Sequence, residues 1–556
     1  MALNLISVNI KIHLNLPQIY LPLKRSLLLI FLFAALFSSC RWFKDTPEVG
    51  LVLSEHFNNK LYKDFDTSVY NVLFKKHLDS AGSKFSNPKV VTAFYKANNF
   101  EPVLVTRFFA DGQLDSLAAY ISRSPEHGFN PKSFRYRQIE ELLQTLKENK
   151  FKDIAEVYPV IADLELNTAE GLIKYNNYVN YGVVNPRKVF SRYYIPVARP
   201  DSLSISKVLA TENMVRLLND VQPKDEGYKI FKQQLAKFRL KPNADGARDD
   251  ANTISPVAKT LLVNMERLRW KMPDMGEEYV EVNIPDFSLT WFNDKDTVTH
   301  MKVCVGGPRN EDYAEQLKLF IETGKLDDKP KNHETPVMLS KFNSIQVNPV
   351  WNIPVSIARS EIYYQALRDP YYLSNNNINV YYKGRLVGDP DTIQWNKYPR
   401  EKLPFQFKQG SGGGNALGKF KFVFENGSSI YLHDTNNKSA FRLANRAISH
   451  GCVRVENPLN FAQNLVKDKY QYDDLRMEVN LPPTDTTRMA VYRKKLAKKA
   501  DTVNIFKLKP KWFGVKKDVD ILINYRTAWI ENGRLQFRPD VYRLDAALWD
   551  AMKKFR

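Results

Sequence analysis

The hydrophobic pattern of the chain changes near its middle, from a helical period to the alternation of β-strands. In the first half, apolar side chains recur on one helix face, as at Leu114, Leu117, Ala118 and Ile121 and at Ile154, Val157, Ile161 and Leu164. In the second half, short segments rich in β-branched and aromatic residues are bounded by Gly, Pro, Asn and Asp, at 279–285, 287–292, 299–305, 344–347, 417–424, 429–433 and 519–525. The pattern predicts an α+β protein in which a mainly helical scaffold precedes a mainly β domain.

The length of the chain also requires more than one folding unit. At 556 residues it exceeds the roughly 100 to 200 residues of a typical domain. A stretch with Pro, Asn, Asp and Gly at 241–252 is the clearest linker. We expect a signal or lipoprotein segment over 1–40, a tether over 41–70, a helical scaffold over 71–250 and a second domain over 251–556. Because a strand is expected at 519–525, truncation near residue 480 would remove part of the second core.

An export signal is expected near the start of the chain. Lys24 and Arg25 precede the apolar run 26–37, which has the length of a signal-peptide core and is shorter than the roughly 20 residues of a membrane span. The run ends in Phe-Ser-Ser-Cys40, which resembles a bacterial lipoprotein cleavage signal, with Phe37 where Leu is usual. The alternatives are an uncleaved anchor and a plain secretory signal. In each case we expect the protein in the cell envelope, on the periplasmic side, with Cys40 as the lipidation site.

Composition narrows the partners of such an exported protein. The net charge of +20 suits anionic surroundings, but no nucleic-acid module is recognisable, so we expect no nucleic-acid partner. If Cys40 carries lipid, the remaining cysteines are Cys304 and Cys452, too few for a disulfide framework. Either these two pair, or at least one is retained as a thiol; the strand alternation around Cys304 favours a core position.

Cys452 lies in a segment suited to nucleophilic catalysis. A cysteine nucleophile needs a base to form the thiolate and donors for the oxyanion. His433, at the end of an apolar strand, and His450, two residues before Cys452, are both candidate bases. In a tight turn containing Gly451 the side chains of residues 450 and 452 diverge readily, whereas a strand holds His433 rigidly. Arg454 adds positive potential that favours a thiolate or a carboxylate ligand.

The segment Ser449-His450-Gly451-Cys452-Val453-Arg454, with His433 nineteen residues before the cysteine, resembles the signature of bacterial L,D-transpeptidases. Several flanking segments support the resemblance, at 264–270, 282–285, 335–336, 348–354, 415–418 and 524–529. Together they are similar to the larger subfamily that joins a helical scaffold to the catalytic β fold. The resemblance covers roughly residues 75 to 556.

This resemblance implies a cysteine acyltransferase of peptidoglycan. Cys452 would attack the third residue of a donor stem peptide, and an acceptor amine would then capture the acyl group; His433 would move the proton. Ser449, His450 and the backbone from Gly451 to Val453 would shape the oxyanion and substrate site, and Arg454 would orient the loop or a substrate carboxylate. No metal or cofactor is implied. With water or a protein amine as acceptor, the same site would make a carboxypeptidase, an endopeptidase or an anchoring enzyme. An inactive wall-binding lipoprotein is the alternative of another class.

Three features depart from the subfamily pattern. The peptidoglycan-binding module usual between scaffold and catalytic domain is replaced by the short stretch 241–258. A charged, helix-capable segment is inserted at 310–332, and the segment 488–517 is enlarged and rich in Lys and Arg, which is more typical of a solvated face than of an anion-binding surface.

We also expect a lid at about 356–410, with Trp351, Tyr371 and Tyr372 lining either the cleft or a core.

Overall fold

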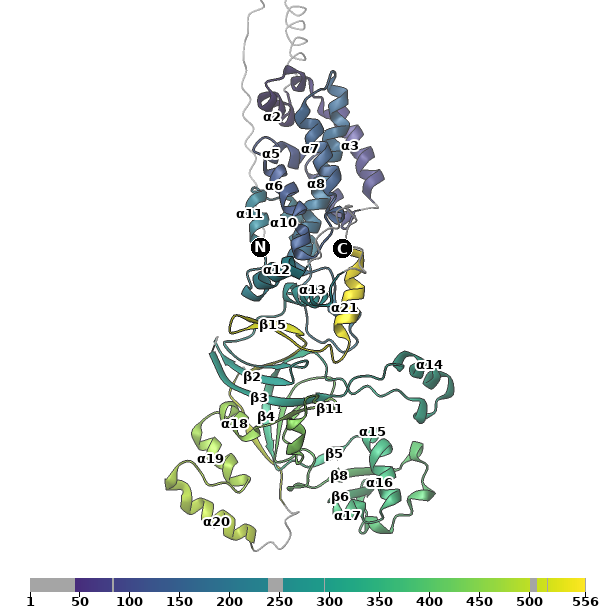
Figure 1. Ribbon diagram of the computed structural model, residues 1–556, viewed down its shortest axis with the longest axis vertical. Helices are drawn as coiled ribbons and strands as arrows, with labels where there is room; N and C mark the ends of the chain where they lie inside the picture. Colours follow the sequence, from purple (N-terminus) through teal and green to yellow (C-terminus); the bar gives the residue numbers. More distant parts are fainter. Residues whose placement is uncertain are drawn as a thin grey trace, which may run out of the picture.

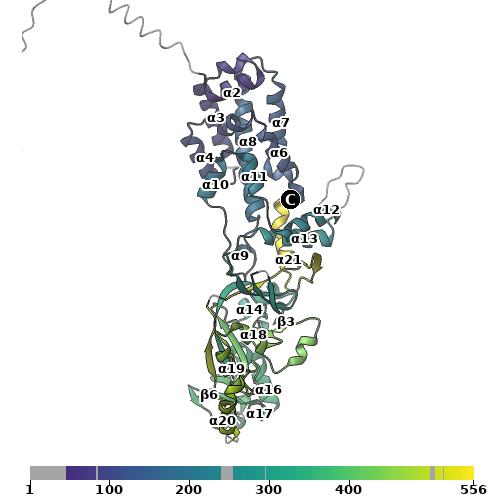
Figure 2. The ribbon, with the colours of Figure 1, turned by 90° about the vertical axis from the view of Figure 1, so that its left-hand side faces the viewer.

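The computed structural model describes residues 46–82, 85–238, 254–294, 296–500, 508–517 and 519–555. The predicted signal segment, Cys40 and the linker lie outside these residues. The molecule is elongated, with the helical part at one end and the β-rich part at the other (Figures 1 and 2). The predicted α+β class, helical first and mainly β afterwards, is confirmed. Among the described residues, no helix combines the length and apolar character needed to cross a membrane.

The helical part is built around one long helix, α8 (Ile154–Tyr181), whose N-terminus is capped by Asp153 accepting from the amide of Ala155. The predicted stripe is in place, because Val157, Ile161 and Leu164 are buried in the scaffold core. The surrounding helices are α2 (Glu48–Phe57), α3 (Thr67–Gly82), α4 (Pro88–Ala97), α5 (Val103–Phe108), α6 (Gln113–Ser122), α7 (Tyr136–Glu148), α10 (Ser202–Leu209) and α11 (Met214–Asp220).

The expected tether needs a correction at its centre. Residues 48–57 form α2, and Val49 and Leu53 are buried in the same core as α8. Gly50 permits this packing, since a Cβ there would lie 2.6 Å from the carbonyl oxygen of Tyr62. Val49 and Leu53 are four residues apart and therefore lie on the same face of the helix, which packs against the scaffold core.

The scaffold and the β-rich part meet through a buried polar network. On α13 (Pro256–Arg269), Arg269 pairs with Glu266 at 3.0 Å, and both side chains are fully buried. Arg269 also donates to the phenol of Tyr228 on α12 (Glu226–Phe238) and to the carbonyl of His127. The C-terminal helix α21 (Leu544–Met552) packs beside α13 (Figure 1), and the ring of Phe555 contacts Tyr178 of α8.

The β-rich part is a mixed sheet of ten strands that closes on itself. The order is β11-β3-β12-β10-β9-β4-β14-β1-β2, with β13 paired to β4, and the additional pairing of β2 with β3 completes the circuit. β14 lies between β4 and β1 with every residue buried, as expected for a core strand beyond residue 480. The strands are β1 (Glu278–Asn283), β2 (Ser288–Asn293), β3 (Asp296–Gly306), β4 (Met338–Val347), β9 (Phe420–Phe424), β10 (Leu432–His433), β11 (Ala447–Ser449), β12 (Val453–Val455), β13 (Lys511–Gly514) and β14 (Asp520–Asn524).

Residues 351–410, which include the expected lid, form a small subdomain that we call the cap. It has its own sheet, in the order β5-β8-β6-β7, and its own core around Leu373, Val380 and Trp395. The elements of the cap are β5 (Trp351–Ile353), α15 (Val355–Ile357), the π-helix η6 (Ala358–Ile362), α16 (Tyr363–Arg368), α17 (Tyr372–Asn375), β6 (Ile378–Tyr382), β7 (Arg385–Leu386) and β8 (Phe405–Gln409).

The two enlarged segments lie on the outside of the β-rich part. The insertion carries α14 (Tyr313–Thr323), which projects from the molecule and buries none of its residues (Figure 1). The basic segment forms α20 (Met489–Ala500), next to α18 (Pro458–Leu465) and α19 (Lys469–Glu478) at the end opposite the scaffold. A short hairpin, β15 (Ala528–Glu531) and β16 (Arg534–Phe537), leads back to the junction.

Candidate functional site

Cys452 lies in the tight loop between β11 and β12, and its side chain is half-buried against the β-domain core. Side-chain oxygens lock the loop: Ser449 Oγ donates to the carbonyl of Cys452 at 2.6 Å and accepts from the amide of Gly451 at 3.1 Å. Thr335 Oγ1 donates to the carbonyl of Gly451 at 2.8 Å. Gly451 adopts φ +122°, a conformation that other residues rarely reach. The nucleophile candidate is therefore held in a fixed position.

His433 stands on the strand next to the cysteine, as expected. β10 pairs in parallel with β12, with His433 opposite Arg454. The ring is buried, and Nδ1 donates to the carbonyl of Asp434, which can only accept. Nε2 is therefore the nitrogen left to accept a proton. Burial, followed by the positive charge of Arg454, lowers the pKa of His433 to about 3, so the resting ring is neutral.

His450 contacts the cap instead. Its Nε2 pairs with Glu361 Oε1 of η6 at 2.6 Å, and its ring lies 4.4 Å from that of His333 between centroids. The hydrogen bond from His450 lowers the pKa of Glu361, and burial lowers the pKa of His333 to about 4. Of the two candidate bases, His450 is already engaged by a carboxylate, which favours His433.

Tyr431 is a site residue that sequence reasoning missed. Its backbone and phenol both hydrogen-bond Cys452, and the side chain of Trp351, at the base of the cap, hydrogen-bonds the phenol in turn. Val453 donates to the carbonyl of Tyr431 at 3.1 Å, which ties the two strands together here. The only signal available was its position two residues before His433, within the strand expected at 429–433 and therefore on the same face of that strand.

The electrostatics of the site are dominated by burial and two cations. Burial raises the pKa of Cys452 above its ordinary value, although the hydrogen bonds from Tyr431 and the charges of Lys421 and Arg454 act in the opposite direction. The resting group is therefore a thiol that needs a base. Lys421, on β9 opposite His433, was also missed by sequence reasoning.

The second cysteine does not pair with the first. Both thiols are free, and Cys304 is completely buried on β3 in a small cluster with Ala440 and Phe441. Burial raises the pKa of Cys304, which keeps it protonated. The core position expected for Cys304 is what the structure has.

The cap aromatics fall into different environments. Trp351 reaches the site through Tyr431, whereas Tyr371 is 62% exposed on the outside of the cap. Tyr372 packs against the core of the cap. Of the three residues expected to line either a cleft or a core, Trp351 and Tyr372 both pack against the core of the cap, and Trp351 also contacts Tyr431 of the site.

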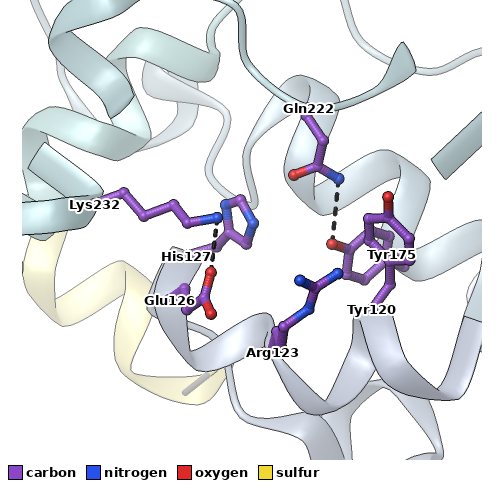
Figure 3. A pocket seen from close by; sticks show the side chains of 7 residues that line it. All are labelled: Tyr120, Arg123, Glu126, His127, Tyr175, Gln222 and Lys232. Carbon is purple, nitrogen blue, oxygen red and sulfur yellow. Dashed lines mark hydrogen bonds and ion pairs between the residues drawn. The ribbon is translucent and has the colours of Figure 1, made fainter. Parts of the chain in front are cut away.

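A cavity of about 200 Å³ lies in the scaffold, far along the molecule from Cys452. Figure 3 shows its lining, in which Lys232 pairs with Glu126 at 2.7 Å and Gln222 donates to the phenol of Tyr175. His127 is engaged by Tyr228. Since these side chains partner one another and no cysteine is present, we regard the cavity as part of the junction and not as the reactive site. The described residues contain no cluster of three or more groups able to hold a metal ion.

Two regions of the chain match known domain families. Residues 277–489 match the L,D-transpeptidase catalytic domain, and residues 89–235 match the scaffold domain. The chain is thus similar to the L,D-transpeptidase catalytic domain over most of its β-rich part and to the scaffold domain over most of its helical part. A protein of Haemophilus influenzae named "Putative L,D-transpeptidase" is 30% identical over 307 residues. That match covers 54% of this chain and 52% of the relative, so the chain spans about half the length of the curated relative it matches.

Proposed function

We propose that this protein is a peptidoglycan L,D-transpeptidase that joins the third residues of two stem peptides through an acyl-enzyme on Cys452. One observation carries the proposal: a cysteine held in a rigid loop, bonded to Tyr431 and flanked by a neutral His433, within a domain of this family. This arrangement supplies a nucleophile, a base and an oxyanion donor.

In the first half of the reaction, His433 Nε2 takes the proton of the Cys452 thiol as its sulfur attacks the carbonyl of the third donor residue. The carbon–sulfur bond forms, the amide bond to the terminal D-amino acid breaks, and the amine leaves with the proton that His433 returns. The low pKa of His433 suits this return, because the protonated ring is a strong acid once the thiolate has been consumed. The Tyr431 phenol stabilises the charge that develops on the carbonyl oxygen.

In the second half, the side-chain amine of an acceptor stem attacks the thioester. His433 accepts a proton from this amine, the new amide bond forms, and the sulfur leaves and recovers its proton. Water in place of the amine would give hydrolysis.

Product analysis with a purified disaccharide-tetrapeptide tests the proposal. We expect a cross-linked dimer and free D-amino acid, detected by mass spectrometry, and a thioester adduct on the Cys452 peptide after rapid quenching. A tripeptide without dimer would identify a carboxypeptidase. Absence of both products and adduct from folded, reduced protein would refute the proposal and favour a wall-binding protein.

Two variants separate the two thiols of the folded chain. Cys452→Ala should abolish both dimer and adduct. Cys304→Ala is the matched control, because it removes the other free cysteine, buried on the adjacent strand, and should leave turnover within about twofold. Equal activity loss in the two variants would argue against Cys452 as the nucleophile.

We further propose that Cys40 carries a lipid anchor and that the protein acts in the periplasm. The proposal rests on the sequence of the exported segment, 24–40. Cys40→Ser should abolish metabolic labelling with radioactive palmitate and release the protein from the membrane fraction. Persistent labelling of that variant would exclude Cys40 as the lipidation site.

A further inference from the structure

Lys421 stands beside the nucleophile without an anionic partner. It lies on β9, opposite His433 on β10, and its Nζ sits 4.0 Å from the centre of the Tyr431 ring. In the part of the chain that the structure describes, the Lys421 side chain makes no hydrogen bond or ion pair. The Lys421 ammonium instead makes a cation–π contact with Tyr431, whose phenol hydrogen-bonds Cys452.

Such a position is unfavourable for a charged lysine side chain, because it loses part of its hydration. The side chain is half-buried, and burial lowers the pKa of Lys421 below its usual value. A cation–π contact compensates for only part of the lost hydration. Arg454, on the neighbouring strand, has a buried Nε that also lacks a hydrogen-bond partner among the described residues. Unpartnered cations that converge on a nucleophile indicate an anionic ligand.

The donor peptide in the proposed reaction contains such an anion in the right place. Only one amide nitrogen and one α-carbon separate the attacked carbonyl from the terminal carboxylate of the leaving D-amino acid. When Cys452 reaches that carbonyl, the carboxylate must lie close to the sulfur. Tyr431 links the sulfur, through its phenol, to Lys421, over its ring face.

We propose that Lys421 binds the terminal carboxylate of the donor stem peptide and thereby selects stems that end in a free D-amino acid at the fourth position. The inference rests on the proposed function and specifies its donor. The leaving residue is held at its charged end while its amide bond breaks, so the interaction fixes the scissile carbonyl against Cys452. Lys421 takes no proton and forms no covalent bond to the substrate.

The competing role for Lys421 is stabilisation of the Cys452 thiolate alone. Both roles predict slower turnover without the lysine, so activity loss does not distinguish them. The terminal group of the donor does. A thiolate effect is the same for every donor and cancels in a ratio of two donors, whereas a carboxylate contact is lost when that carboxylate is an amide.

The test compares two disaccharide-tetrapeptides, one ending in D-alanine and one in D-alanine amide, with wild type and Lys421→Met. We expect wild-type kcat/KM to favour the free acid by roughly ten- to a hundredfold, the range of a hydrogen bond to a charged group. Lys421→Met should lose this preference because its kcat/KM falls on the free-acid donor. Its kcat/KM on the amide donor should change little. Lys421→Arg should retain part of the preference.

Lys408→Met is the matched control. Lys408 has the same kind of contact, with Nζ 4.6 Å from the ring centre of Tyr381, but belongs to strand β8 of the cap. It should leave the acid-to-amide ratio unchanged.

Each outcome decides. A wild-type ratio near one overturns the inference even if Lys421→Met fails to fold, because it is measured on the native protein. A preference that survives in Lys421→Met, or equal losses on both donors, also overturns it. Failure of wild type to process either donor would instead refute the proposed function.

Discussion

Buried and half-buried charged side chains have different partners in the scaffold and around Cys452. In the scaffold, the carboxylate of Glu165 is completely buried and accepts from the amides of Leu104 and Val105 and from the phenol of Tyr95. At the junction, Arg269 and Glu266 satisfy each other. Around Cys452, by contrast, the charges are incompletely paired in the described part of the chain. Lys421 makes a cation–π contact with Tyr431 but no ion pair, and the Nε of Arg454 has no hydrogen-bond partner.

The contrast separates structural from functional polarity. A buried group whose partners are all supplied by the protein stabilises one conformation and has nothing left for a ligand. A group left incompletely satisfied destabilises the empty protein and is available to a substrate. Substitutions in the first set should therefore change stability, and substitutions in the second set should change turnover.

The largest effect on turnover is expected from His433→Gln. Loss of the proton acceptor should lower kcat by roughly a hundred- to ten-thousandfold, because a thiol with a raised pKa cannot ionise unaided. Release of the D-amino acid from a tetrapeptide donor measures this.

His127→Gln is the control in the scaffold for that prediction. His127 is also buried and also hydrogen-bonded, to Tyr228 at 2.8 Å. It should lower the unfolding temperature while leaving kcat nearly unchanged. Turnover should be compared at a temperature where both histidine variants are fully folded. If both then lost turnover equally, the distinction between structural polar groups in the scaffold and functional ones around Cys452 would fail.

The largest effect on stability is expected at the junction between the scaffold and the β-rich part. Glu266→Gln keeps the shape of the side chain but leaves the guanidinium of Arg269 buried without its counter-charge. We expect a loss of about 3–5 kcal/mol in the free energy of unfolding, measured by urea denaturation followed by circular dichroism. The double variant Glu266→Gln with Arg269→Met should recover part of the loss. A single-variant change below about 1 kcal/mol would show that the pair is dispensable.

Much of this architecture could be predicted from local patterns in the sequence. The change from helical to alternating periodicity predicted the two halves, and the position of His433 at the end of a strand predicted that it would lie on a strand adjacent to the Cys452 segment, as the pairing of β10 with β12 has it. The burial of Ile521, Leu522 and Ile523 follows from three consecutive apolar residues, whereas the burial of the polar Asp520 and Asn524 at the ends of the strand does not. These features depend on residues close together in the chain, where periodicity is informative.

The remaining site residues depend on pairings that no local pattern specifies. Lys421 reaches the site only because β9 pairs with β10 in a register that sets it opposite His433. His450 and Glu361 meet across the 89 residues that separate them in the chain, and the direction of His450 in a tight turn was undecidable from spacing. The cap likewise has its own core, although its sequence suggested a lid. The domain boundary drawn at 70 excludes α2, which packs in the scaffold core, and the boundary drawn at 250 stays a prediction.

A smaller stability effect should depend on pH and comes from Glu165. Burial raises the pKa of Glu165 to about 7, from 4.5, despite its hydrogen bonds. The folded state then binds more protons than the unfolded state between those values, so this contribution is fully present below pH 4.5 and is lost as pH rises through 7. The shift corresponds to about 3 kcal/mol at most.

Glu165→Gln tests this dependence. The uncharged amide should remove the decline in unfolding free energy between pH 5 and 8 that we expect of wild type, as measured by urea denaturation across that range. An unchanged pH profile in the variant would mean that the carboxyl group ionises at the same pH in the folded and unfolded states.

The smallest expected effect lies where the cap meets the Cys452 loop. Glu361→Gln removes the charge that pairs with His450 while retaining an acceptor, and the pair is partly exposed. An exposed pair contributes at most about 1 kcal/mol, so kcat/KM should fall by no more than about fivefold, with the unfolding temperature unchanged. Asp327→Asn is the control, because Asp327 pairs with Arg400 of the cap at 2.7 Å without touching His450. If the two variants behave alike, the His450 contact has no particular role. A selective loss in Glu361→Gln would place the cap within the functional set of polar groups, although its core belongs to the structural one.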